Sequence, residues 1–260
     1  MNHVEKLRAK AEQGQLCFGT HCALSDLEFY EICGLLGYDY VWIDSEHASV
    51  TFPLLKNAII ATNAGGACAI VRVADHQMCN VKPILECGAD GVVFPMVNTA
   101  QEARHCVSLC TYPPRGSRGY GPHRAQDYGT LPLAEYLEVA DRRLLKLMQC
   151  EHIDSVNNLD EILEVEGVDG IICGAMDLSA SVGKLGSYFD PEVVDLMERI
   201  IAKCKAHGKP FGLSMGMDEK LMEFWISRGA TLMSVGAPLD YFREMGKTFL
   251  AKARAMEAQR

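Results

Sequence analysis

The sequence predicts an α/β fold, a single (β/α)₈ barrel in which eight parallel strands close into a ring and each is followed by a helix. Short, almost continuous apolar runs alternate with amphipathic segments, which is typical of a parallel sheet buried on both faces. Eight such units fit into 260 residues, a length that suits one barrel better than an open doubly wound sheet. Neither G-x-G-x-x-G nor G-x-x-x-x-G-K-[ST] occurs, which disfavours the usual nucleotide-binding folds, and no linker divides residues 1–260.

The apolar runs mark the expected strands, and helical patterns fill the stretches between and around them. The expected strands lie at residues 16–24, 40–44, 67–73, 91–96, 146–151, 169–174, 209–214 and 231–237. The expected helices lie at residues 1–15, 26–36, 52–64, a segment ending at 87, 99–110, 154–165, 190–207, 218–228 and 239–257. Gly37 and the pair Gly65-Gly66 end two of these helices, because glycine readily adopts the left-handed conformation of a helix end.

Residues 112–145 interrupt this alternation. The stretch is rich in proline and glycine, carries the cationic segment YPPRGSRGYGPHR, and has a short helical pattern near its end. A connection of this length inside a compact domain is usually functional. We expect a flexible cationic lid over a site for an acidic substrate. A phosphate- or RNA-binding loop and a solvated loop at a subunit contact are the alternatives.

Charge and cysteine content exclude several classes of protein. The formal net charge of −9 argues against nucleic acids and anionic membranes as partners. No apolar run approaches the ~20 residues that span a bilayer, and the charged N-terminal pattern lacks the apolar core of a secretory signal. The 11 cysteines are scattered without a C-x-x-C pair, and most lie inside apolar runs. We expect reduced, structural thiols and a cytoplasmic protein.

Two carboxylates follow neighbouring strands of the predicted barrel. Glu151 ends the run KLMQCE, and Asp177 lies in the segment GAMDLS after the next strand, with Gln149 and Ser179 nearby. Active sites of such barrels lie at the carboxyl ends of the strands, so we expect the two acids to lie close together. Mg²⁺ and similar hard cations take one or two carboxylates and leave positions open for a chelating substrate. Either acid alone could instead cap a helix or pair with an arginine.

Polar residues also end the second and third strands. His47 follows Asp44 in the segment DSEH, where an imidazole oriented by a carboxylate could act as a general acid or base. Arg72 ends an apolar strand, where its guanidinium could bind a carboxylate or a developing enolate oxygen. The alternatives are a surface histidine, an aspartate that caps the strand end, and a structural ion pair of Arg72 with Asp44 or Asp75.

Seven segments together resemble the HpcH/HpaI family of metal-dependent (class II) 2-oxo-acid aldolases, which includes 2-keto-3-deoxy-sugar-acid and 4-hydroxy-2-oxoheptanedioate aldolases. They are, in chain order, GYDYVWIDSEHA, AIVRV, GADGVVFPMVNTAQEAR, YPPRGSRG, MQCEHIDSVNNLDEI, VEGVDGIICGAMDLSASVG and GATLMSVG. The resemblance runs from about residue 16 to residue 240, and the order and spacing of the segments make it specific.

The resemblance implies a homo-hexamer of two trimers in which neighbouring subunits exchange the last helix. It implies that Glu151 and Asp177 bind a divalent cation, Mg²⁺, Mn²⁺ or Co²⁺. His47 would be the acid/base with Asp44 as its partner, and Arg72 would face the pyruvate oxygen. The expected substrate-binding residues are Gln149, Gly174, Ala175, Met176 and, from the cationic loop, Arg118.

Two positions depart from the family pattern. Gly-Pro-x-Asp-Leu-Ser is usual where this chain has Gly174-Ala175-Met176-Asp177, and the missing proline should loosen the turn that holds the substrate carboxylate. Glu86 stands where the family often has an aspartate before the fourth strand. It is a candidate for reaching a neighbouring subunit's site.

These residues suit the cleavage of a 4-hydroxy-2-oxo acid to pyruvate and an aldehyde. A divalent cation would stabilise the enolate that forms when the bond between carbons 3 and 4 breaks, and His47 would take the proton of the 4-hydroxyl. A Schiff-base route needs a lysine at a strand's carboxyl end. Lys146 and Lys209 begin strands and Lys184 lies in a loop, so we do not expect that route.

Other functions share this set of residues. Decarboxylation of oxaloacetate and cleavage of a malyl or citryl thioester pass through the same enolate, although no segment suggests a site for the nucleotide part of a thioester. A non-catalytic barrel that binds a 2-oxo acid is the third alternative. The cationic loop favours an acidic aldehyde such as tartronate semialdehyde or succinic semialdehyde, and lactaldehyde stays open.

Overall fold

The computed structural model describes residues 3–258. It confirms the predicted (β/α)₈ barrel: the strands form a closed ring in chain order, each parallel to the next, and the last pairs with the first. The strands are β1 (Cys17–Cys22), β2 (Tyr40–Asp44), β3 (Cys68–Arg72), β4 (Gly91–Phe94), β5 (Leu145–Cys150), β6 (Gly170–Cys173), β7 (Phe211–Met215) and β8 (Leu232–Val235). Each strand lies on the apolar run from which it was predicted.

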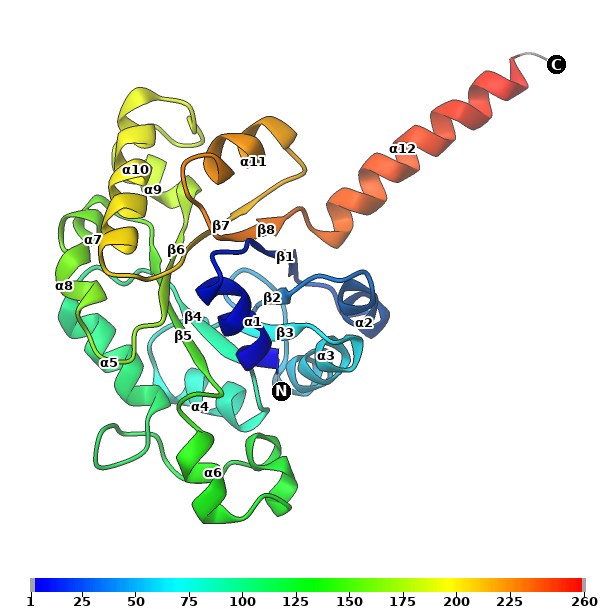
Figure 1. Ribbon diagram of the computed structural model, residues 1–260. Coiled ribbons are helices and arrows are strands. Elements are labelled where there is room, and N and C mark those ends of the chain that lie inside the picture. The colour runs from blue at the N-terminus through cyan, green and yellow to red at the C-terminus, as the bar shows by residue number, and fades with distance from the viewer. Residues whose placement is uncertain (1–2, 259–260) are drawn as a thin grey trace.

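Helices surround the ring of strands (Figure 1). They are α1 (His3–Glu12), α2 (Leu27–Leu35), α3 (Phe52–Gly65), α4 (Met78–Glu86), α5 (Ala100–Cys110), α6 (Leu133–Val139), α7 (Ile153–Asn157), α8 (Leu159–Leu163), α9 (Ala175–Ser181), α10 (Pro191–Ala206), α11 (Glu219–Ile226) and α12 (Pro238–Glu257), with a 3₁₀ segment η1 (Arg124–Gly129). The helix predicted at the start of the chain is confirmed by α1, and its first two residues lie outside the described part.

Two segments differ from the prediction. The single helix expected at 154–165 is broken at Asn158, whose side-chain amide donates to the carbonyl of Asn98 (2.9 Å). Asparagine favours such side-chain bonds over the helical backbone. The segment expected as a loop around Asp177 forms α9, and Leu178 fixes it by burying its side chain in the core.

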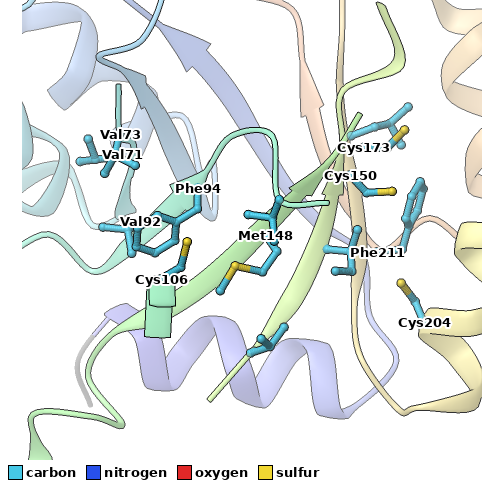
Figure 2. Packing of buried hydrophobic residues seen from close by; sticks show 14 of the residues in the cluster. Val71, Val73, Val92, Phe94, Cys106, Met148, Cys150, Cys173, Cys204 and Phe211 are labelled. Carbon is cyan, nitrogen blue, oxygen red and sulfur yellow. The ribbon is translucent and has the colours of Figure 1, made fainter. Parts of the chain in front are cut away.

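Two apolar layers hold the barrel together. Inside the ring, inward-facing side chains such as Trp42 and Leu147 form one cluster, and Val4 and Leu7 of α1 close its amino end. The outer layer lies between strands and helices and includes Val92, Phe94, Met148 and the thiols of Cys150, Cys173 and Cys204 (Figure 2). All 11 cysteines are free and nine of them are buried, as expected for thiols that serve as small apolar side chains.

Four helix-to-strand turns at the amino end repeat one motif of a glycine, an apolar residue and an aspartate or threonine. The copies are Gly37-Tyr38-Asp39, Gly88-Ala89-Asp90, Gly167-Val168-Asp169 and Gly229-Ala230-Thr231. Each glycine has a positive φ, at which other residues are strained. Each third side chain accepts a hydrogen bond from a backbone N–H of the preceding strand, namely those of Phe18, Ala69 and Lys146 (2.8 Å each) and Phe211 (3.3 Å). The motif therefore ties each even-numbered strand to its neighbour.

The long connection between α5 and β5 lies at this same amino end. Arg124 donates to the carbonyls of Cys87 (3.2 Å) and Gly88 (2.9 Å), where α4 gives way to β4, and to Oδ1 of Asn63 (2.8 Å). The expected lid over the carboxyl-end site is therefore wrong within this chain. The reason is topological: a loop that follows a helix and precedes a strand lies at the opposite end from the loops that follow strands. The helical piece expected in it is α6.

The last helix, α12, extends away from the barrel (Figure 1). Only Pro238, at its first position, is buried, and its exposed apolar side chains are Leu239, Phe242, Met245, Phe249, Leu250 and Met256. Within residues 3–258, none of the helices has the length and apolar character needed to cross a membrane.

Candidate active site

Glu151 is a buried acid at the carboxyl end of the barrel. It directly follows β5, and its carboxylate accepts hydrogen bonds from the backbone N–H of Met96 (2.6 Å) and from the side-chain amide of Gln149. Met96 has a φ of 51°, an uncommon conformation for a residue other than glycine. Burial raises the pKa of Glu151, and the negative charges of Glu46 and Asp177 raise it further. The site therefore holds one carboxylate in an unfavourable environment for its charge.

Two other acids surround Glu151. Asp177 is exposed in the first turn of α9, and its negative charge is one of those that raise the pKa of Glu151. Glu46, which follows β2, was not assigned a role from the sequence. Burial raises the pKa of Glu46, the positive charges of Arg72 and His47 act against the increase, and Asp44 and Asp177 add to it. Three carboxylates thus share one region.

Gly174 lets the chain pass close to these groups. A Cβ at this position would lie 2.3 Å from Oε2 of Glu151 and 3.0 Å from Nε2 of Gln149, so no side chain fits there without displacing the acid. Oε1 of Gln149 is buried and has no hydrogen-bond partner within the described chain. Crowded carboxylates and an unused amide oxygen are the donors that a hard divalent cation takes.

These donors fit a cation held by few protein ligands. Among residues 3–258, no group of three or more histidine, cysteine, aspartate or glutamate side chains has an arrangement that would enclose a metal ion. A cation bound here would take at most two such side chains and would leave positions open for a ligand.

The turn that lacks the family's proline is braced by other contacts. The hydroxyl of Ser179 donates to the carbonyl of Met176 (2.7 Å) and accepts from the backbone N–H of Gly186 (2.9 Å). The hydroxyl of Tyr188 contacts the sulfur of Met176. The backbone from Gly174 to Met176 is therefore held against Glu151 from the far side.

Arg72 links two acids at the ends of β2 and β3. Its Nε and Nη2 donate to Asp44 (3.0 and 2.7 Å), its Nη1 lies 3.0 Å from Glu46, and its guanidinium lies over the ring of Trp42. Burial alone would raise the pKa of Asp44, but its contacts with His21 and Arg72 hold that pKa well below the usual range. The ion pair with Asp44, one of the expected alternatives, is present. The buried guanidinium also brings a fixed positive charge beside the acids.

The expected pairing of the Asp44 and His47 side chains is not present in the described chain. Glu46 and His47 approach Asp44 only through their backbone N–H groups (3.0 and 3.4 Å), and this turn directs the His47 ring outward. The ring lies 3.7 Å from Glu46, and 68% of the side chain is exposed. His47 therefore stands at the rim of the site.

The imidazole that Asp44 does contact is His21 of β1, at 3.2 Å from Nε2 to Oδ2. Sequence reasoning missed it, because a single histidine in the run LCFGTHCAL has the same pattern as a core residue. The available signal was strand alternation, which places residue 21 on the inward face next to the end of the strand.

Arg118 and Glu86 do not belong to this end of the barrel. Glu86 is the last residue of α4, which runs toward the amino end, and Arg118 lies 3.6 Å from it, with its guanidinium over the ring of Tyr112. Arg118 also lines a cavity of about 440 Å³ together with Asp90 and Leu144, which precede β4 and β5. The expected role of Arg118 in substrate binding is therefore contradicted within one chain, for the same topological reason as the lid.

The structural neighbours of this chain share its whole length. The solved HpcH/HpaI aldolase from Desulfitobacterium hafniense DCB-2 superimposes with a TM-score of 0.88 at 27% identity, over 95% of this chain and 96% of the other. An HpcH/HpaI aldolase/citrate lyase family protein from Burkholderia cenocepacia J2315 gives 0.90 at 27% identity, over 96% and 99%. A protein solved as citrate synthase SbnG gives 0.85 at 26% identity, over 97% and 98%.

Sequence comparisons agree. The 5-keto-4-deoxy-D-glucarate aldolase of Citrobacter koseri is 34% identical over 239 residues, which are 92% of this chain and 92% of that protein, and the enzyme of the same name from Klebsiella pneumoniae is 33% identical over the same length. The profile of the HpcH/HpaI aldolase/citrate lyase family matches residues 18–244. The chain therefore belongs to the HpcH/HpaI aldolase/citrate lyase family, a family of carbon–carbon lyases.

Proposed function

We propose that the chain is a class II aldolase that reversibly cleaves a 4-hydroxy-2-oxo acid to pyruvate and an aldehyde. The observation that carries the proposal is the buried carboxylate of Glu151, whose pKa is raised by burial and, against the hydrogen bonds from Met96 and Gln149, by the negative charges of Glu46 and Asp177. A buried carboxylate with like charges near it is unfavourable without a cation. Membership of a carbon–carbon lyase family supplies the reaction class.

Glu151 and Asp177 would hold the cation, Mg²⁺, Mn²⁺ or Co²⁺, beside Gln149. When bound, the cation supplies Lewis-acid stabilisation of the enolate oxyanion. The backbone of Gly174, Ala175 and Met176 would bind the carboxylate of the 2-oxo acid, since the absence of a side chain at 174 lets a ligand approach Glu151 closely.

The chain's other polar residues would then handle charge and protons. Arg72 brings a positive charge, fixed by Asp44, toward the developing enolate. His47 is the proposed acceptor of the 4-hydroxyl proton, and Glu46 is the acid that faces its ring. The bond between carbons 3 and 4 breaks, its electron pair forms the enolate of pyruvate, and the aldehyde leaves.

The positions of the lysines support a class II route. Lys146 is the second residue of β5, at the amino end, and Lys209 donates to the carbonyl of Val168 (2.7 Å) before β7. Lys184 pairs with Asp190 (2.6 Å) and Glu192 (2.9 Å). None of the three is placed for a Schiff base.

Relatives narrow the substrate class. The curated proteins named above are aldolases of a deoxy keto sugar diacid, at 33–34% identity. We propose a 2-keto-3-deoxy sugar acid or a related diacid as the substrate. The similarity to a citrate synthase favours a second candidate, carbon–carbon chemistry on an oxo diacid such as oxaloacetate, which passes through the same enolate.

A homo-hexamer of two trimers is proposed for the assembly. Its support is α12, which extends from the barrel with its apolar side chains exposed and would be covered if neighbours exchanged it. Both carboxylate oxygens of Glu86 and two nitrogens of Arg118 are buried without hydrogen-bond partners in the described chain. Glu86 is the residue proposed to reach a neighbouring subunit's site, which would require this segment to rearrange in the assembly.

Metal depletion tests the function. Protein treated with EDTA should lose cleavage of 4-hydroxy-2-oxo acids and regain it with Mg²⁺, Mn²⁺ or Co²⁺, and the Glu151→Ala variant should not regain it. Glu135→Ala, which removes an exposed acid of α6, is the matched control and should behave as the wild type. Cleavage that survives complete chelation in both the wild type and Glu151→Ala would refute the proposal.

A further inference from the structure

A second histidine, His21, faces the carboxyl end and has no part in the reaction described so far. It alternates with Cys17 and Gly19 on β1, so its side chain points into the barrel. Its ring lies against that of Trp42, with centroids 5.5 Å apart, and its Nε2 contacts Asp44. The His21 side chain is 29% exposed, whereas that of Asp44 is 4% exposed. Nε2 is buried beside Asp44 but has no hydrogen-bond partner within the described chain, and the rest of the ring is partly open to the mouth of the barrel.

The polar residues of this end form an arc that follows the order of the ring. His21 lies on β1, Asp44 on β2 and Arg72 on β3, and the pair Glu151 and Asp177 follows β5 and β6. In a ring of eight strands β1 stands opposite β5, so His21 lies across the mouth from the acid pair. A 2-oxo acid held beside Glu151 would extend its remaining carbons toward His21.

Unpartnered polar atoms line the inward positions on both sides of His21. Nε1 of Trp42 on β2 and Oγ of Ser234 on β8 are buried and have no hydrogen-bond partner within residues 3–258. Ser234 pairs in register with Gly19, two residues before His21. Buried polar groups in proteins nearly always have a partner. This side of the barrel is therefore suited to a polar ligand rather than an apolar one.

We propose that His21 is a specificity-determining residue that binds a hydroxyl or carboxylate on the aldehyde fragment of the substrate. The proposal rests on the aldolase function and adds to it the side chain that recognises the aldehyde fragment of the substrate. Nε2 is buried against Asp44, so Nδ1 is the nitrogen available to the ligand. Replacing the imidazole with an apolar ring would leave the ligand's polar group unpaired, whereas an apolar aldehyde would lose nothing.

The test compares aldehydes that differ in one polar group, each condensed with pyruvate. The pairs are glycolaldehyde with acetaldehyde, and succinic semialdehyde with butanal. The His21→Phe variant should lower the ratio of kcat/KM for the polar over the apolar aldehyde by about tenfold or more. His21→Gln, which keeps an amide that can donate, should lower it less. Decarboxylation of oxaloacetate has no aldehyde fragment and should fall by much less than condensation of the polar aldehyde, since the expected contact is absent.

His207→Phe is the matched control. His207 also lies 3.2 Å from an aspartate, Asp160, but on the outside of the barrel, and its replacement should leave the ratio unchanged. An unchanged ratio in His21→Phe would overturn the inference and leave the aldolase proposal standing. An equal loss with both aldehydes and with oxaloacetate would also overturn it, because it would mean that His21 only positions Asp44 and Arg72. A wild-type protein that condenses no aldehyde with pyruvate would refute the aldolase proposal itself, and the inference with it.

Discussion

At the amino end of the barrel, acidic side chains are satisfied by the fold itself. Asp39, Asp90 and Asp169 each accept a backbone N–H of the preceding strand. Asp39 also pairs with Lys10 (2.6 Å) and Asp169 with Arg8 (2.9 Å), both from α1. Burial raises the pKa of Asp90, but two hydrogen bonds and then the positive charges of His3 and Arg124 act against the increase.

At the carboxyl end Glu151 has acids as its charged neighbours instead. The same burial raises the pKa of Glu151, but here the neighbouring charges, Glu46 and Asp177, are negative and add to the increase. Buried carboxylates thus serve two purposes in one barrel. Those with backbone and cationic partners stabilise strand pairing, and those with acidic neighbours retain the capacity to bind a cation and substrate. The two sets should respond to mutation in opposite ways.

The largest expected effect is on catalysis at the carboxyl end. Glu151→Gln removes a proposed metal ligand, and because even the outer partners of metal ligands are worth about 10–100-fold, we expect kcat/KM for cleavage to fall by at least about a hundredfold. Folding should not suffer, since the variant loses a charge whose pKa is raised by burial. Steady-state kinetics and thermal unfolding of the metal-free protein measure the two effects. A Glu151→Gln variant that keeps full activity would contradict the assignment of cation binding to the acids of the carboxyl end.

The matching change at the amino end should affect stability instead. Asp90→Ala leaves the N–H of Ala69 and the side-chain amide of Asn63 without their acceptor, which should lower the free energy of unfolding by about 1–3 kcal/mol. Activity per folded molecule should be unchanged. Urea unfolding and active-site titration measure this. A large loss of kcat without a loss of stability would show that the amino-end motif has a catalytic role.

Asp44 lies at the carboxyl end but has cationic partners. The pH dependence of its contribution to stability therefore sharpens the comparison between the two ends. Its folded pKa lies below the unfolded value, so its contribution to stability is complete above the ordinary aspartate pKa and is lost as the pH falls through the lower folded value. Asp44→Asn should therefore be less stable than the wild type near neutral pH. The difference should narrow as the pH falls below about 4, where the unfolded wild-type carboxyl becomes protonated. Urea unfolding at a series of pH values would show the narrowing, and a difference that widens toward acid would contradict it.

The smallest effect concerns the thiols. Cys79 is exposed on α4 and Cys87, just after α4, is partly exposed, while the other nine are buried. Burial raises the pKa of several buried thiols, to about 11 for Cys17 and about 12 for Cys150. Alkylation of the native protein should label Cys79 first and Cys87 more slowly, and all 11 should react after unfolding. Rapid labelling of Cys150 would show that the outer layer opens.

Much of the fold could be predicted because strands of a sheet that is buried on both faces appear in the sequence as almost continuous apolar runs. The eight apolar runs and the glycines at helix ends follow from this, and the acids after the fifth and sixth strands could be placed on one end of the barrel. The end of the barrel at which a loop lies was harder to predict from the sequence. Arg118 was assigned to the site from its charge alone, whereas the order helix–loop–strand places it at the other end.

Side-chain directions at the rim could not be predicted. Spacing favoured the pairing of Asp44 with His47, but the turn after β2 uses the backbone of His47 and directs its ring outward. His21 contacts Asp44 across two strands, a relation that depends on the register of β1 with β2 and not on any local pattern. The proposed role of α12 likewise could not be derived from sequence patterns, because it depends on contacts with a neighbouring subunit.

The central claim is that the acids of the carboxyl end bind a cation beside a 2-oxo acid, whereas those of the amino end do not. Relaxation of the pyruvate methyl protons by protein-bound Mn²⁺ tests it directly, because the broadening requires both ligands to be near each other. We expect broadening with wild type and with Asp90→Ala, and none with Glu151→Gln. Equal broadening with Glu151→Gln, or its loss with Asp90→Ala in folded protein, would contradict the account.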